Sequence, residues 1–216
     1  MSERRTIEVS RTARYHVVGG AGAECREVWF VLHGYGQLAG AFLESLRSLS
    51  RPARLLIAPE ALSRFYLRRG TGEVGASWMT KEAREDEIAD TVHYLERLWE
   101  HVRAEHGLAP AVELCAFGFS QGGAAAARWA VLGGAPVARV TLWGCPLPLD
   151  LELASRPERV RRLRWSFVLG ASDATIDRGA WEKGLERLRA LSVEPEVAHP
   201  AVGHELEPAT LARLGA

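Results

Sequence analysis

Residues 112–123 read VELCAFGFSQGG, and this stretch decides the fold. It begins with an apolar run, Val112 to Phe119, that is typical of a strand buried on both faces. Gly118 to Gly122 then matches the pattern Gly-x-Ser-x-Gly, in which a strand turns sharply into a helix and presents a serine Oγ at the top of the sheet. The alanine-rich segment from Gly122 to Val131 predicts that helix. A glycine-rich turn with a structural serine is the alternative, but the strand before Ser120 and the helix after it favour a nucleophile.

Strand and helix patterns alternate along the rest of the chain. Residues 5–18 predict a two-strand lead-in. The longest predicted helix, over 81–106, has Thr80 as its expected N-cap and Gly107 as its expected terminator. The predicted strands span residues 27–33, 54–58, 112–119, 137–143, 165–169 and 193–198, and the predicted helices span 81–106, 122–131, 179–191 and 205–214. This order predicts a doubly wound, mostly parallel α/β sheet with helices on both faces, in a single domain over residues 1–216.

A nucleophilic serine needs a base, and the base needs an acid that orients it. In a sheet of this kind the acid and then the histidine follow the serine along the chain. The histidines after Ser120 are His199 and His204. His204 is the expected base because it lies in a loop, from which the imidazole can reach across to the serine. Asp173 directly follows a buried strand and is the expected acid, with Asp177 as the alternative.

Two backbone segments are candidates to stabilise negative charge on a tetrahedral intermediate, which requires preorganised N–H donors. One donor is expected from Gln121, because it follows the nucleophile. The other is expected from Tyr35 in the segment HGYGQ at 33–37, where glycines let the backbone approach a substrate. An ordinary glycine turn is the alternative at this second position.

An apolar acyl pocket has candidate residues in the middle of the chain. Trp78 and Met79 are the residues that we assign to substrate binding, and residues 65–67 (FYL) could contribute. Each of these side chains could equally belong to the core beneath a loop.

The chain resembles the phospholipase/carboxylesterase family of small α/β-hydrolases, which includes acyl-protein thioesterases. The matching segments are LHGYG (32–36), GFSQGG (118–123), TLWGCPLP (141–148), GASD (170–173) and GH (203–204), in the family's order. The resemblance covers residues 26–210 and implies an α/β-hydrolase fold with metal-independent hydrolysis of carboxylic esters or thioesters through an acyl-serine intermediate. It also implies a triad of Ser120, Asp173 and His204 and an oxyanion hole formed by Tyr35 and Gln121.

Two segments depart from the family's pattern. Gln37 stands where the family often has an aspartate, and SWMT at 77–80 only loosely resembles the family's tryptophan-containing loop. No long insertion separates the strands over 137–143 and 165–169, so no large cap domain is expected. We therefore expect an open site for small to medium acyl groups.

Composition excludes several other classes of function. The 216 residues include 27 basic and 27 acidic side chains, so no long-range positive field would attract nucleic acid. The most apolar stretch, 129–149, is interrupted by glycine, proline and arginine, which is not typical of a membrane span.

Three cysteines without paired spacing and the lack of a secretory signal pattern favour the cytoplasm. No short metal-ligand pattern and no dinucleotide fingerprint occur, so no metal or cofactor is expected.

The expected partner is a small-molecule ester or thioester, and a homodimer is left open. An amidase, a peptidase or a perhydrolase would use the same residues and is an alternative. A non-catalytic binding protein of the same fold is another, but such relatives typically lack one triad member. This chain has a candidate for each position.

Overall fold

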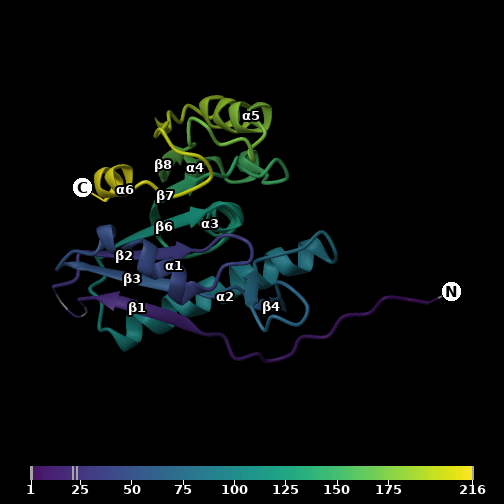
Figure 1. Cartoon of the computed structure of the whole chain (residues 1–216). Helices are drawn as coiled ribbons and strands as arrows, with labels where there is room; N and C mark the ends of the chain where they lie inside the picture. The colour runs from purple at the N-terminus through teal and green to yellow at the C-terminus, as the bar shows by residue number, and fades with distance from the viewer. Residues whose placement is uncertain (1, 21, 23, 216) are drawn as a thin grey trace.

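The computed structural model describes residues 2–20, 22 and 24–215, and its centre is a seven-stranded sheet (Figure 1). The strand order is β1-β3-β2-β6-β7-β8-β9, with β1 antiparallel to β3 and the other pairs parallel. The strands are β1 (Tyr15–Gly19), β2 (Glu27–Leu32), β3 (Arg54–Pro59), β6 (Glu113–Phe119), β7 (Val137–Trp143), β8 (Arg164–Val168) and β9 (Glu196–Ala198). A separate hairpin pairs β4 (Ser63–Tyr66) with β5 (Val74–Ser77).

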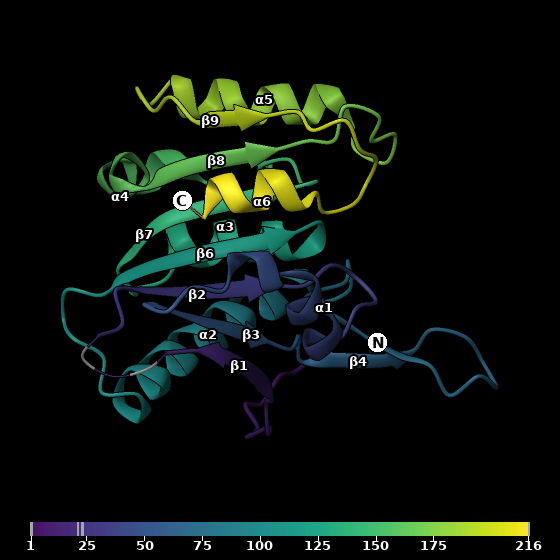
Figure 2. The same ribbon diagram turned by 60° about the vertical axis from the view of Figure 1, so that its left-hand side comes forward.

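Helices cover both faces of the sheet (Figure 2). One face packs against α2 (Arg84–Glu105), α3 (Gln121–Leu132), α4 (Pro157–Arg162) and α5 (Arg178–Arg189), and the 3₁₀ turn η2 (Leu153–Ser155) joins the same core. The other face packs against α1 (Ala39–Ser45), the 3₁₀ turn η1 (Arg47–Leu49) and α6 (Pro208–Leu214). The predicted doubly wound, mostly parallel sheet is confirmed.

The alternation of side chains in β2 explains why the central strands are apolar throughout. Val28 and Phe30 join the core beneath α2 and α3, whereas Trp29 and Val31 join the core beneath α1 and α6. A parallel strand that is covered on both faces needs apolar residues at every position. The uninterrupted apolar runs in the sequence therefore reflect two cores.

The chain reverses direction across the sheet between β2 and β6. From β2 it continues through α1 to β3 on one side, and it returns through α2 to β6 on the other side of β2. Strands β2 and β6 are neighbours, but the loop after β2 leads to a helix on one face of the sheet and the loop after β6 leads to a helix on the opposite face. Such a switch point is where open α/β sheets bind ligands.

Some local predictions were wrong. Residues 5–14 form no strand; the N-terminal segment extends away from the body of the molecule (Figure 1), and Ile7 is 86% exposed. Alternating apolar residues stabilise a strand only when they have a core face to cover. Helix α2 begins at Arg84, and Thr80 is not its N-cap, because Ala83 adopts a left-handed conformation with φ 47° and separates the two.

Within the described residues, no helix is both long enough and apolar enough to cross a membrane.

Gly122 provides a test of the close packing at the β2–β6 junction, because a Cβ there would lie 2.2 Å from the Leu32 carbonyl oxygen. We expect Gly122→Ala to lower the free energy of unfolding by about 1–3 kcal/mol, the usual cost of overpacking. Gly203→Ala is the control, because a Cβ there would meet nothing within 4 Å. Urea unfolding followed by tryptophan fluorescence measures both, and wild-type stability of Gly122→Ala would contradict this account of the junction.

Candidate active site

Ser120 lies at a sharp turn between β6 and α3 and has backbone angles of φ 52° and ψ −123°. A non-glycine residue in such a conformation costs on the order of 1–3 kcal/mol, and it persists only where its surroundings fix it. Two hydrogen bonds do so here. The Ser120 N–H donates to the Trp143 carbonyl (2.8 Å), and the Gly123 N–H donates to the Ser120 carbonyl (2.9 Å). The turn is therefore held by the neighbouring strand β7 and by the first turn of α3.

Glycines flank the turn because the backbone leaves no room for side chains. A Cβ at Gly118 would lie 2.2 Å from the Gly122 oxygen, and one at Gly123 would lie 2.7 Å from the Cys145 Cβ. Real Cβ atoms do not approach other atoms so closely, so both positions require glycine. Gly122, the second glycine of the Gly-x-Ser-x-Gly pattern, is equally restricted by the Leu32 carbonyl oxygen, so the pattern has a steric basis at both of its glycines.

The structure brings Ser120, His204 and Asp173 together in one chain of hydrogen bonds. His204 Nε2 lies 2.9 Å from Ser120 Oγ, and His204 Nδ1 lies 2.7 Å from Asp173 Oδ2. A carboxylate only accepts hydrogen bonds, so it fixes the proton of His204 on Nδ1. Nε2 is then free to accept the proton of the Ser120 hydroxyl.

Asp173 is ionised despite its burial. Its side chain is 1% exposed, and desolvation alone would raise the pKa of the carboxyl. Hydrogen bonds outweigh this effect and lower the pKa below its ordinary value. They come from the Thr175 hydroxyl (2.6 Å), the Thr175 N–H (2.9 Å) and His204. Thr175 was not identified in the sequence, although an aspartate often accepts a hydrogen bond from the backbone N–H two residues later in a turn.

The loops that carry Asp173 and His204 are held side by side by backbone hydrogen bonds. The Ala171 N–H donates to the Pro200 carbonyl (2.8 Å), and the Ser172 N–H donates to the Val202 carbonyl (3.1 Å). Trp143 fixes the histidine loop from the other side, since its indole N–H donates to the Glu205 carbonyl (2.9 Å). The two loops are therefore tied to each other, and Trp143 ties the histidine loop to the strand that also holds the Ser120 N–H.

The alternative residues have other roles. Asp177 caps α5 by accepting hydrogen bonds from the backbone N–H groups of Gly179 (2.8 Å) and Ala180 (3.3 Å). His199 Nδ1 lies 3.0 Å from the Leu169 carbonyl oxygen. Neither side chain contacts Ser120 or His204 in the described part of the chain.

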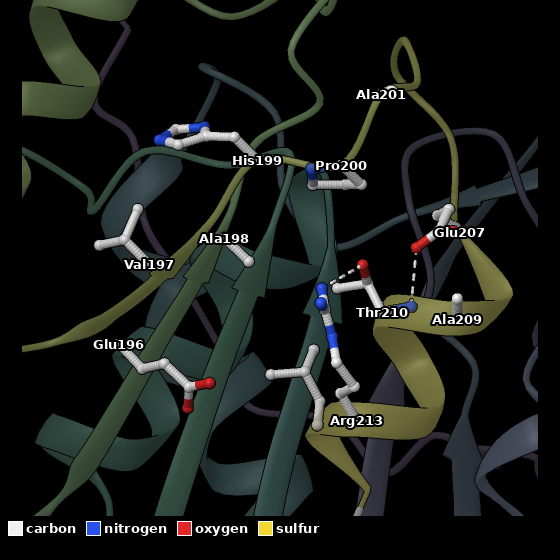
Figure 3. Close-up of a pocket in the computed structure, with 11 residues that line it drawn as sticks. Glu196, Val197, Ala198, His199, Pro200, Ala201, Glu207, Ala209, Thr210 and Arg213 are labelled. Carbon is white, nitrogen blue, oxygen red and sulfur yellow. Dashed lines mark hydrogen bonds between the residues drawn. The ribbon is translucent and has the colours of Figure 1, made fainter.

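A wide groove lies away from these three side chains. It has a volume of about 620 Å³ and is bordered by β9, the loop that follows it and α6 (Figure 3). His199, Glu196 and Arg213 line it, whereas Ser120, Asp173 and His204 do not. We therefore place the candidate chemistry at the switch point and not in this groove.

The segment after β2 forms a tight turn beside the serine. Gly36 has φ +77°, and the Gln37 N–H donates to the Gly34 carbonyl (3.2 Å), as expected for a turn with a left-handed third residue. The turn is also paired with β5, because the Gly36 N–H donates to the Ala76 carbonyl (2.9 Å). The Tyr35 N–H makes no backbone hydrogen bond within the described residues, and the side chain of Tyr35 is 60% exposed.

Gln121 joins this region to the loop after β5. As the first residue of α3, its backbone N–H has no partner within the helix. Its side-chain oxygen accepts from the Trp78 N–H (2.9 Å), and its side-chain nitrogen donates to the Met79 carbonyl (2.8 Å). These three residues line a small cavity of about 10 Å³, roughly the space of one water molecule. Trp78 itself is only 4% exposed, so most of its surface belongs to the core.

Asp177 offers a test that separates it from Asp173. We expect Asp177→Ala to lower the free energy of unfolding by about 1 kcal/mol, because two N–H groups at the start of α5 lose their acceptor. Asp177→Asn is the control, since an asparagine oxygen can still cap the helix. Chemical denaturation measures both. Equal stability of Asp177→Ala and the wild type would show that the cap contributes nothing.

Comparisons with known proteins place the chain in a family. A model of the phospholipase/carboxylesterase family matches residues 14–214. No curated protein sequence matches the chain significantly.

Solved structures with the same fold include proteins from plants and bacteria. Acyl-protein thioesterase 2 from Zea mays has a TM-score of 0.74 and 18% identity, with 94% of this chain and 96% of that chain covered. A carboxylesterase from Mesorhizobium loti has a TM-score of 0.71 and 20% identity, with 94% and 93% covered. SOBER1 from Arabidopsis thaliana has a TM-score of 0.70 and 20% identity, with 88% and 96% covered. At these identities the likeness establishes the α/β-hydrolase fold, here without a large cap. Because the family model spans nearly the whole sequence, the chain belongs to the phospholipase/carboxylesterase family.

Proposed function

We propose that this protein is a serine hydrolase that cleaves carboxylic esters or thioesters of small to medium acyl groups. The observation that carries the proposal is the unbroken chain of hydrogen bonds from Ser120 through His204 to Asp173. Membership of the phospholipase/carboxylesterase family supports the reaction class. The structural likeness to a carboxylesterase and an acyl-protein thioesterase is in keeping with both leaving groups.

In the first half of the proposed reaction, Ser120 Oγ attacks the carbonyl carbon of the substrate. His204 Nε2 takes the hydroxyl proton as the new C–O bond forms, and ionised Asp173 stabilises the resulting imidazolium. The imidazolium then gives this proton to the departing alcohol or thiol. An acyl-Ser120 ester is left on the enzyme.

In the second half, water replaces the leaving group. His204 Nε2 removes a proton from the water molecule, whose oxygen attacks the acyl carbon, and the same proton returns to Ser120 Oγ when the ester bond breaks. The products are a carboxylic acid and the free serine. These steps use only the three side chains and water.

The negative charge of both tetrahedral intermediates needs donors at a fixed place. We assign this role to the backbone N–H groups of Tyr35 and Gln121. The positive end of the α3 dipole adds to the effect, because Gln121 is the first residue of that helix.

An apolar surface next to the turn over residues 33–37, here called the oxyanion turn, suits an acyl chain. The rings of Tyr35 and Phe65 lie 5.1 Å apart, and Leu67, which is 45% exposed, borders Gly36. The small cavity beside Gln121 has too little space for a long chain in this conformation. Both features favour a small to medium acyl group that rests on an open surface.

The first test of the proposal is labelling by a fluorophosphonate probe. We expect the wild type to react at Ser120, as read by peptide mass. We expect Ser120→Ala to remain unlabelled and to lose ester hydrolysis by at least about 10⁴-fold. Ser155→Ala is a matched control, because Ser155 is exposed and lies in η2, outside the site. A folded wild-type protein that neither reacts nor hydrolyses esters would refute the proposal and favour a non-catalytic binding protein.

The second test assigns the acid. Asp173→Asn should lower kcat by about 10³- to 10⁴-fold, because the amide no longer stabilises the imidazolium or fixes the tautomer of His204. Asp177→Asn should leave kcat near the wild-type value, since it changes only a helix cap. Steady-state kinetics with a p-nitrophenyl ester measures both variants. The reverse ranking would assign the acid to Asp177.

A further inference from the structure

The buried side chain of His33 has a defined tautomer. Its Nε2 accepts a hydrogen bond from the Ala61 N–H (3.1 Å), so this nitrogen carries no proton. The proton is therefore on Nδ1, which lies 2.8 Å from the Gly34 carbonyl oxygen and donates to it. His33 is completely buried, and desolvation is the main reason why its pKa lies below the ordinary value. The neutral form with both hydrogen bonds is thus the one that the fold maintains.

Gln37 holds the same glycine from the other side of the turn. Its side-chain oxygen accepts from the Gly34 N–H (2.7 Å), and its backbone N–H donates to the Gly34 carbonyl (3.2 Å). Both peptide groups that flank the Gly34 Cα consequently have fixed partners. Gln37 is also the position at which the sequence departs from the aspartate that is frequent in the family.

These contacts determine the direction of the Tyr35 N–H. The Gly34 carbonyl and the Tyr35 N–H belong to one planar, trans peptide group, in which C=O and N–H point in opposite directions. His33 and Gln37 hold the carbonyl on the inner side of the turn. The N–H must therefore point to the outer side, where it makes no backbone hydrogen bond within the described residues.

The turn over residues 33–37 is packed against the strand-to-helix turn over residues 118–122, here called the elbow, on both sides of Ser120. A Cβ on Gly34 would lie 3.1 Å from the Phe119 ring, and a Cβ on Gly122 would lie 2.5 Å from the His33 carbonyl oxygen. The peptide group of residues 34 and 35 is thus fixed relative to the serine by its own hydrogen bonds and by close packing.

We propose that His33 and Gln37 are positioning residues that hold the peptide between Gly34 and Tyr35 so that the Tyr35 N–H faces the oxyanion formed at Ser120. The inference rests on the proposed hydrolase function. Neither side chain is expected to touch the substrate. His33 holds the carbonyl of this peptide directly, whereas the Gln37 side chain fixes the preceding peptide through the Gly34 N–H and so sets the turn in which the Gln37 N–H reaches the same carbonyl. Their loss should reduce stabilisation of the transition state more than binding of the ester.

The decisive experiment compares Gln37→Leu with Gln37→Glu. Leucine removes the acceptor for the Gly34 N–H, whereas a glutamate carboxylate retains one at the same chain length. We expect Gln37→Leu to lower kcat by about 10- to 100-fold, somewhat less than the complete loss of an oxyanion donor. KM for a p-nitrophenyl ester should stay within about twofold of the wild-type value, as expected when only the transition state is affected. Gln37→Glu should restore most of kcat.

A trifluoromethyl ketone adds a readout that a general loss of stability would not change in the same way. It forms a tetrahedral adduct with the serine, so its inhibition constant should rise in Gln37→Leu by about the same factor by which kcat falls. His33→Asn and His33→Leu form a second pair, because the asparagine amide can replace the Nδ1–H donor and leucine cannot. If the buried His33 variants do not fold, the Gln37 pair decides.

The outcomes separate this inference from the function on which it rests. Wild-type protein without ester hydrolysis or probe labelling would remove both. An active wild type together with unchanged kcat in folded Gln37→Leu would overturn the positioning role alone. Equal losses in Gln37→Leu and Gln37→Glu, or a loss confined to KM, would also overturn it.

Discussion

The position of Ser120 depends on a backbone contact that only glycine permits. The first turn of α3 lies directly against the end of β2, so that a Cβ on Gly122 would overlap the carbonyl oxygens of Leu32 and His33. This approach brings the loop after β2 next to the turn after β6. Because the two strands are neighbours at the switch point of the sheet, one close contact joins the serine to the turn over residues 33–37, the proposed oxyanion turn.

The histidine and the aspartate are held by a different principle. Their loops lie beyond β8 and β9 and carry no strain comparable with that of Ser120; backbone hydrogen bonds between residues 171–172 and 200–202 hold them together. Gly170 makes this pairing close, since a Cβ there would lie 2.2 Å from the Gly203 oxygen. The site therefore consists of two halves, which are joined by the His204–Ser120 hydrogen bond and by Trp143, whose carbonyl holds Ser120 and whose indole holds the histidine loop.

The sequence predicts those features that are local or that follow from burial. The central strands are recognisable because burial on both faces requires uninterrupted apolar runs, and the elbow is recognisable because its glycines have fixed spacing. The β4–β5 hairpin and the roles of Thr175, His33 and Gln37 were not predicted. Thr175 and Gln37 bond to residues only two and three positions away, so their roles depend on the exact turn that the backbone adopts, which an apolar pattern does not indicate. The role of His33 depends in addition on Ala61, which only the folded chain brings to it. Of the two-strand lead-in predicted over residues 5–18, only the second strand forms, as β1; residues 5–14 have no surface to cover and form none.

In the proposed function, the hairpin of β4 and β5 would link substrate selection to charge stabilisation. Strand β5 pairs with the oxyanion turn, because the Gly36 N–H donates to the Ala76 carbonyl. The two segments are close, since a Cβ on Gly75 would lie 2.4 Å from the Gly36 oxygen. Strand β4 carries Phe65, whose ring packs against the exposed ring of Tyr35. The element that borders the proposed acyl site is thus the same element that supports the turn of the proposed N–H donor, Tyr35. Insertions or substitutions that reshape the apolar surface therefore act on the oxyanion turn as well. The pairing at Gly36 and the hydrogen bonds to Gly34 are the contacts that oppose such a displacement.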